Sequence, residues 1–179
     1  MTDHAGVIIT QRLGLDWIPD ETEMQILWYL YSQKSASIAG IANVLGSDAG
    51  EISKETAREA VQRLLQARVI TRGLSRSQLI LPWKTLEILR EIQLGRARYP
   101  DIPVDVLTKP FSELVFLFVP VGKENRARAP EIRRRITSAG FALRGNVAQA
   151  LEELWKSGRV QRWRLLPDRG QYCYWRDPA

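Results

Sequence analysis

The chain has 179 residues, of which 45% are hydrophobic and 26% are charged, a composition typical of one medium or two small globular domains. Its longest apolar run, LVFLFV at 114–119, is far shorter than the roughly 20 residues of a membrane-spanning helix, so we expect no membrane partner. A single cysteine, Cys173, and a single histidine, His4, exclude an intramolecular disulfide and most zinc and acid–base sites, while the net charge of +6 favours a polyanionic partner.

The N-terminal region begins with an apolar segment and a capped helix. The segment GVIITQRL at 6–13 is rich in β-branched residues and is predicted to be a short strand or an extended arm. A helix is predicted to follow Asp20, which can accept a hydrogen bond from the first turn, and Glu23 stands at the third helical position, where it completes a capping box.

Two further helices and a hairpin are predicted before residue 84. Ser37 is placed to cap a short helix that ends at Gly46, and Ser53 is placed to cap a longer one. The segment VITRGLSRSQLILPW at 69–83 then predicts two short strands around a Gly/Ser turn.

A helix and a proline-containing segment are predicted to join the two halves of the chain. Residues 84–98 have a helical pattern with apolar residues on more than one face, so this helix is expected to pack against both domains or against a second copy of the protein. Pro100, Pro103 and Pro110 then predict a stiff, extended linker.

The C-terminal half has four predicted elements. The pattern at 112–122, SELVFLFVPVG, leaves helix and strand open. A helix is predicted over 129–140, with Pro130 in its first turn, and another over 143–158. Residues 159–175 are predicted to form a strand, a turn and a second strand.

The two halves repeat the same order of elements. When Leu64 is aligned with Leu154, an offset of 90 residues, helix, helix, helix and hairpin follow one another in both copies. This arrangement resembles the winged helix-turn-helix superfamily, in which a short helix and a recognition helix precede a two-stranded wing. The resemblance covers roughly residues 20–83 and 111–177.

The resemblance implies a fold that is mainly α with short β-hairpin wings. We expect a winged-helix domain at 1–83 with an extended N-terminal arm, a linker helix and proline-containing linker at 84–110, and a basic winged-helix domain at 111–179.

The charge of the chain is unevenly distributed. Residues 1–95 hold 10 Lys and Arg against 11 Asp and Glu, whereas residues 109–179 hold 14 against 7. Because the C-terminal part has few acids with which its arginines can pair, its charge favours contact with nucleic-acid phosphates.

In the winged-helix family, side chains near the start of the recognition helix reach base edges in the DNA major groove. The resemblance therefore implies base reading by early, outward residues of the second copy: Arg144, Asn146 and Gln149, with Gly145 allowing a close approach of the backbone. The phosphate-binding candidates are basic residues on the preceding helix and on the wing: Arg133, Arg134, Arg135, Arg162, Arg164 and Arg169.

The first copy is a weaker candidate for DNA binding. Its residues for contact with the DNA backbone are Lys54, Arg58, Arg72 and Arg76. However, its third helix begins among Glu51, Glu55 and Glu59, whose carboxylates would oppose phosphates. An interaction or dimerisation role is an equally open prediction for this copy.

The leading interpretation is a non-enzymatic, sequence-specific double-stranded DNA-binding protein, a transcriptional regulator located in the cytoplasm with the nucleoid. No catalytic, cofactor-binding or metal-binding residues are assigned, because nucleophile, base and ligand types do not converge on any segment. A protein-interaction subunit of paired winged helices and a plasmid or phage replication or partition protein remain as alternatives. Homodimerisation is expected through the 84–98 helix or the N-terminal domain.

Overall fold

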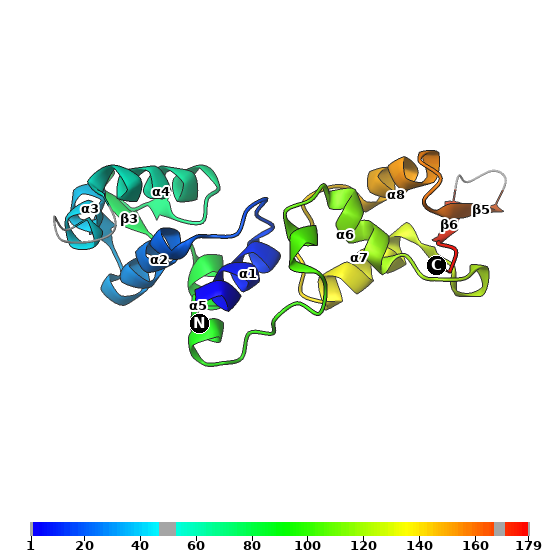
Figure 1. Cartoon of the computed structure of the whole chain (residues 1–179), viewed down its shortest axis with the longest axis horizontal. Helices are drawn as coiled ribbons and strands as arrows, with labels where there is room; N and C mark the ends of the chain where they lie inside the picture. The colour runs from blue at the N-terminus through cyan, green and yellow to red at the C-terminus, as the bar shows by residue number, and fades with distance from the viewer. Residues whose placement is uncertain (1, 47–52, 167–170, 179) are drawn as a thin grey trace. The chain divides into compact units, whose positions relative to one another are not determined.

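A computed structural model describes residues 2–46, 53–166 and 171–178, and the chain divides into two compact units, Met1–Tyr99 and Pro100–Ala179 (Figure 1). No helix in these described ranges is both long enough and apolar enough to span a membrane. Both units combine helices with a small antiparallel sheet, so the mainly helical fold with short strands is confirmed.

The N-terminal unit contains five helices and one small sheet within its described residues. In chain order these elements are α1 (Thr2–Leu13), α2 (Glu21–Gln33), β1 (Ala36–Ser37), α3 (Ile38–Leu45), α4 (Lys54–Gln66), β2 (Thr71–Arg72), β3 (Gln78–Ile80) and α5 (Trp83–Gln93). The strands pair in the order β1-β3-β2, and all pairs are antiparallel. Strand β3, the last of the three in the sequence, therefore lies in the middle of the sheet.

The predicted helix starts of this unit are confirmed. Asp20 Oδ1 accepts the Glu23 N–H at 2.8 Å, and Glu23 Oε2 accepts the Asp20 N–H at 3.0 Å, which completes the capping box of α2. Ser37 and Ser53 each accept a hydrogen bond from the N–H three residues further on, at the starts of α3 and α4.

The predicted strand or extended arm at 6–13 is wrong, because this segment belongs to helix α1. Residues 7–11 are all buried, and Ile8 and Ile9 belong to the hydrophobic core of the unit. Helix α1 lies beside α5 and α2 (Figure 1). Burial against these helices outweighs the strand preference of the β-branched residues.

The segment predicted as a linker at 84–110 is shared between the two units. Helix α5 packs on α1 and α2, and Ile88 and Leu89 are buried in the core of the N-terminal unit. The residues from Pro100 onwards belong to the C-terminal unit, where Val106 and Leu107 are buried.

The C-terminal unit repeats the order helix, strand, helix, helix, strand, strand. Its elements are the 3₁₀ turn η1 (Val104–Leu107), α6 (Phe111–Phe118), the 3₁₀ turn η2 (Lys123–Asn125), β4 (Ala127–Arg128), α7 (Ala129–Ser138), α8 (Val147–Lys156), β5 (Gln161–Leu166) and β6 (Gln171–Trp175). Its strand order, β4-β6-β5, places the last strand in the middle, as in the first unit. The pattern at 112–122, for which helix and strand were both open, contributes most of helix α6.

Candidate nucleic-acid interface

Helix α7 presents three consecutive arginines to solvent. Ile132 and Ile136 face the core, so Arg133, Arg134 and Arg135 between them are all exposed. No salt bridge links these arginines to an acidic side chain within 2–46, 53–166 or 171–178. They therefore form an exposed cluster of positive charge without a salt bridge among the described residues, with Glu131 close enough to Arg134 to interact with it electrostatically.

The acidic residue of α7 is already engaged at the start of the helix. Glu131 Oε2 accepts the Arg128 N–H at 2.9 Å, and the Arg128 side chain donates to Glu131 Oε1 at 3.1 and 3.2 Å. The hydrogen bond from the Arg128 backbone, helped by its guanidinium group, holds the pKa of Glu131 below its usual value. This carboxylate, at the third position of α7, thus satisfies the backbone N–H of the N-cap residue Arg128.

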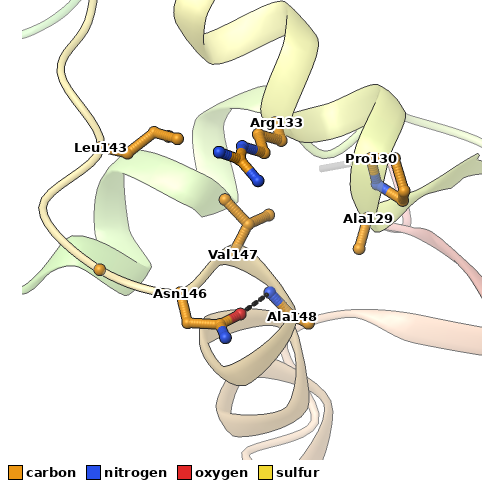
Figure 2. Close-up of a pocket in the computed structure, with 8 residues that line it drawn as sticks. Ala129, Pro130, Arg133, Leu143, Asn146, Val147 and Ala148 are labelled. Carbon is orange, nitrogen blue, oxygen red and sulfur yellow. Dashed lines mark hydrogen bonds between the residues drawn. The ribbon is translucent and has the colours of Figure 1, made fainter.

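A groove of about 500 Å³ lies between the first turn of α7 and the start of α8 (Figure 2). Figure 2 shows Arg133 reaching from α7 towards Val147 in the first turn of α8. The residues lining the groove are Ala129, Pro130, Arg133, Leu143, Gly145, Asn146, Val147 and Ala148. Three of the predicted site residues, Arg133, Gly145 and Asn146, are therefore brought together.

Asn146 is the N-cap of α8. Its Oδ1 accepts the N–H of Ala148 at 2.9 Å, as Figure 2 shows, and the N–H of Gln149 at 3.3 Å. The bidentate contact of an asparagine with adenine uses this same oxygen together with the NH₂ group of the side chain. In this conformation the exposed Asn146 offers an incoming ligand its NH₂ group, while its oxygen stabilises the helix start.

The two residues before Asn146 have structural roles that the sequence did not indicate. The Arg144 guanidinium donates hydrogen bonds to the backbone carbonyls of Leu107 and of Lys109, the latter at 3.1 Å, and so ties the α7–α8 loop to the segment before α6. A Cβ atom on Gly145 would lie 2.9 Å from the Phe111 ring, so any larger residue at this position would force the ring or the loop to shift.

The exposed face of α8 carries mixed charge. Gln149 Nε2 donates to Glu153 Oε1 at 3.3 Å, and both residues line a smaller groove of about 160 Å³ beside the start of α6. Glu152, one residue earlier, accepts Arg162 at 2.7 Å and lies 3.7 Å from Lys156. The acidic groups of α8 thus partly offset the positive charge of its neighbours.

The arginines of the hairpin differ from one another. The Arg162 side chain is only 18% exposed, because its guanidinium lies 3.2 Å from the Trp155 ring centroid and 4.3 Å from that of Tyr172. Arg164 is exposed and has no salt bridge to any acid that the structure describes. The third predicted arginine, Arg169, lies outside the described residues.

Two exposed basic residues near β4 were missed by the sequence analysis. Lys123 lies with its ammonium group 4.9 Å from the Trp163 ring centroid, next to the hairpin. Arg126 donates to the Lys123 carbonyl at 3.3 Å. The basic pattern GKENRAR at 122–128 is the signal that could have identified them.

The predicted site residues of the N-terminal unit lie on α4 and the β2–β3 hairpin. Lys54 and Arg58 are exposed beside the equally exposed Glu55 and Glu59, which gives α4 a mixed surface. Arg72 on the hairpin donates to the Arg76 carbonyl at 2.7 Å. Glu51, the remaining acidic residue of this prediction, lies outside the described residues.

Within the ranges that the structure describes, no three His, Cys, Asp or Glu side chains are grouped so that they could hold a metal ion. No protein-family model matches the chain, and no curated protein matches it either.

Proposed function

We propose that the chain is a tandem winged-helix protein whose C-terminal unit binds double-stranded DNA sequence-specifically, as a transcriptional regulator. The main observation behind this proposal is the exposed cluster Arg133, Arg134 and Arg135 beside the groove at the start of α8. Both units have the order helix, helix, helix and hairpin that the winged-helix resemblance implies, with a two-residue strand between the first and second of these helices.

In this proposal the basic residues fall into two groups, one that contacts phosphates and one that holds the unit together. Arg133, Arg134, Arg135 and Arg164 are exposed and form no salt bridge among the described residues, so they are suited to phosphates. Arg144 and Arg162 are held by contacts inside the unit and position the α7–α8 loop and the hairpin. In this proposal, base reading belongs to Gln149, the Asn146 amide group and the exposed first turn of α8.

The proposal is tested by charge reversal on the full chain. Binding to a pool of genomic fragments is measured by fluorescence anisotropy at two salt concentrations, first with the wild type to identify preferred fragments. Arg134→Glu and Arg164→Glu should each weaken binding to all fragments and lower the salt slope by about 0.9, as expected for one lost phosphate contact.

The matched control is Arg98→Glu, which makes the same charge change at an exposed position of the N-terminal unit. It should leave the preference among fragments unchanged and affect affinity much less than the other two variants. Equal effects of all three variants would rule out the proposed interface, and equal affinity of the wild type for every fragment would rule out sequence-specific binding.

A further inference from the structure

Helix α5 has one face in the core and an opposite face that the unit leaves uncovered. Ile88 and Leu89 are buried on the inner face. At 100° per residue, positions 83, 87, 90 and 94 form a stripe on the other side of the helix. Trp83 is 73% exposed and Leu94 is 50% exposed at the two ends of this stripe, which we call the α5 stripe.

The α5 stripe borders a groove of about 310 Å³. The lining residues are Trp83, Leu86, Glu87, Arg90, Glu91, Leu94 and Arg96. Isolated exposed apolar side chains are common on proteins, but a tryptophan, two leucines and a groove on one helix face are typical of a surface that binds a partner.

Two opposite charges occupy the middle of the stripe. Glu87 and Arg90 are exposed, and neither forms a salt bridge with another residue of the described ranges. Glu91, at the edge of the groove, is instead paired with Arg12 at 3.0 Å and so belongs to the fold of the unit. The charges of Glu87 and Arg90 thus remain available to a partner.

The order of these residues is self-complementary. When two copies of α5 run antiparallel about a two-fold axis between residues 88 and 89, Glu87 of each copy faces Arg90 of the other. The same operation places Trp83 against Leu94 of the second copy. A parallel pair would place Glu87 against Glu87 and Arg90 against Arg90, which is unfavourable.

We propose that a second copy of this chain docks on the α5 stripe, with the two α5 helices antiparallel and joined by reciprocal Glu87–Arg90 pairs. Each copy contributes the same patch, as a two-fold interface requires. The helix of 11 residues is only about 16 Å long, so the interface is small and we expect dissociation at roughly micromolar concentration.

Sedimentation velocity of the full chain, without DNA, tests this pairing over roughly 1 to 100 micromolar. The wild type should pass from monomer to dimer in this range. Glu87→Arg and Arg90→Glu should each raise the dissociation constant at least about tenfold, since each gives both copies like charges at the centre of the interface. Trp83→Ala should also weaken the dimer, and its circular dichroism should match the wild type because Trp83 is largely exposed.

The double variant Glu87→Arg/Arg90→Glu provides the sharpest test, because it exchanges the two charges and restores every pair in the antiparallel arrangement. It should return the dissociation constant to within about threefold of the wild type. Lys84→Glu is the matched control, because it changes the charge of an exposed α5 residue outside the stripe and should have little effect.

Three outcomes would overturn the pairing. The wild type could stay monomeric, the single charge reversals could leave the dimer dissociation constant unchanged, or the double variant could dimerise no more tightly than the single variants. If the wild type stayed monomeric and its α5 stripe were protected from chemical labelling, another part of the same chain would be covering the stripe. Because the experiment contains no DNA, its result is independent of the proposed DNA binding.

Discussion

Arg162 and Arg164 lie on the same strand, yet their surroundings give them different roles. Arg162 packs against Trp155 and Tyr172 and donates to Glu152 at 2.7 Å. An arginine in such an environment stabilises through packing as well as charge. Arg164 has no comparable contacts with described residues and is exposed, so its charge is available to a ligand.

Alanine substitution should separate these two roles. Arg162→Ala removes the ring contacts and the bond to Glu152, and we expect it to lower the free energy of unfolding by about 2 kcal/mol. Arg164→Ala should change that free energy by less than about 0.5 kcal/mol while it weakens DNA binding. Urea unfolding, monitored by tryptophan fluorescence, measures the free energy of unfolding, and fluorescence anisotropy measures the affinity for DNA. An Arg162→Ala variant as stable as the wild type would contradict the stabilising role of Arg162.

A second prediction at this scale concerns Glu23, whose side chain is 0% exposed. Its carboxylate accepts the Trp17 indole N–H at 3.1 Å and the Asp20 N–H at 3.0 Å, and pairs with Arg63 at 2.7 Å. Glu23→Ala leaves the Trp17 indole N–H and the Asp20 N–H without their acceptor and removes one of the two acidic partners of Arg63, so the unfolding free energy should fall by about 2–3 kcal/mol. The exposed Glu21→Ala is the control, with an expected change below about 0.5 kcal/mol, and a similar loss in both variants would show that Glu23 has no special role.

At the scale of elements, local signals predicted helix starts well. Asp20, Ser37 and Ser53 were identified from the sequence, because a cap depends on residues only three positions apart. Helix α1 could not be found in this way, because its β-branched residues become helical by packing on α5 and α2. Strands β1 and β4 have two residues each, too few to show an alternating pattern.

The candidate site was less predictable than the fold, because its side chains meet partners that are distant in sequence. Arg144, predicted to read bases, donates hydrogen bonds to the backbone carbonyls of Val106, Leu107 and Lys109, which are distant in the sequence. Gly145, predicted to let DNA approach closely, also packs against Phe111, which is 34 residues away in the sequence. By contrast, the exposure of Arg133–Arg135 followed from the helical period alone, since Ile132 and Ile136 had to face inward.

The ion pair between Glu113 on α6 and Arg159, three residues beyond the end of α8, should make the C-terminal unit sensitive to acid. The Arg159 guanidinium donates two hydrogen bonds to Glu113 on α6, and these bonds lower the pKa of Glu113 from its ordinary value of 4.5. The folded unit therefore holds the Glu113 proton less tightly than the unfolded chain. This contribution to stability is complete above about pH 4.5 and is lost as the pH falls through the lower folded pKa.

Thermal unfolding between pH 3 and pH 7 tests this tie. In Glu113→Gln, the unit should be less stable at pH 7 and should lose less stability on acidification than the wild type, because the neutral amide does not titrate. Glu124→Gln changes an exposed glutamate on η2 that has no described arginine partner, and should leave the pH profile unchanged. Parallel profiles for wild type and Glu113→Gln would contradict the proposed role of the pair.

At the scale of the whole molecule, the two units share an order of elements but differ in charge. Residues 109–179 carry the basic excess, whereas residues 1–95 are nearly neutral. The exposed cluster of α7 belongs to the C-terminal unit, and the self-complementary α5 stripe belongs to the N-terminal unit. This separation suggests that one unit binds DNA while the other brings two copies together.

If both proposals hold, the dimer should bind two inverted half-sites, because a two-fold protein is matched by a two-fold DNA sequence. Glu87→Arg lacks the dimer contact, so it should lose about a hundredfold in affinity for a selected two-half-site fragment but bind a single half-site like the wild type. Glu87→Arg/Arg90→Glu should regain the affinity for the full fragment. Anisotropy titrations with full and half-site fragments make this comparison. If Glu87→Arg bound the full fragment as tightly as the wild type, α5 pairing would have no part in DNA recognition, since both half-sites would then be occupied independently.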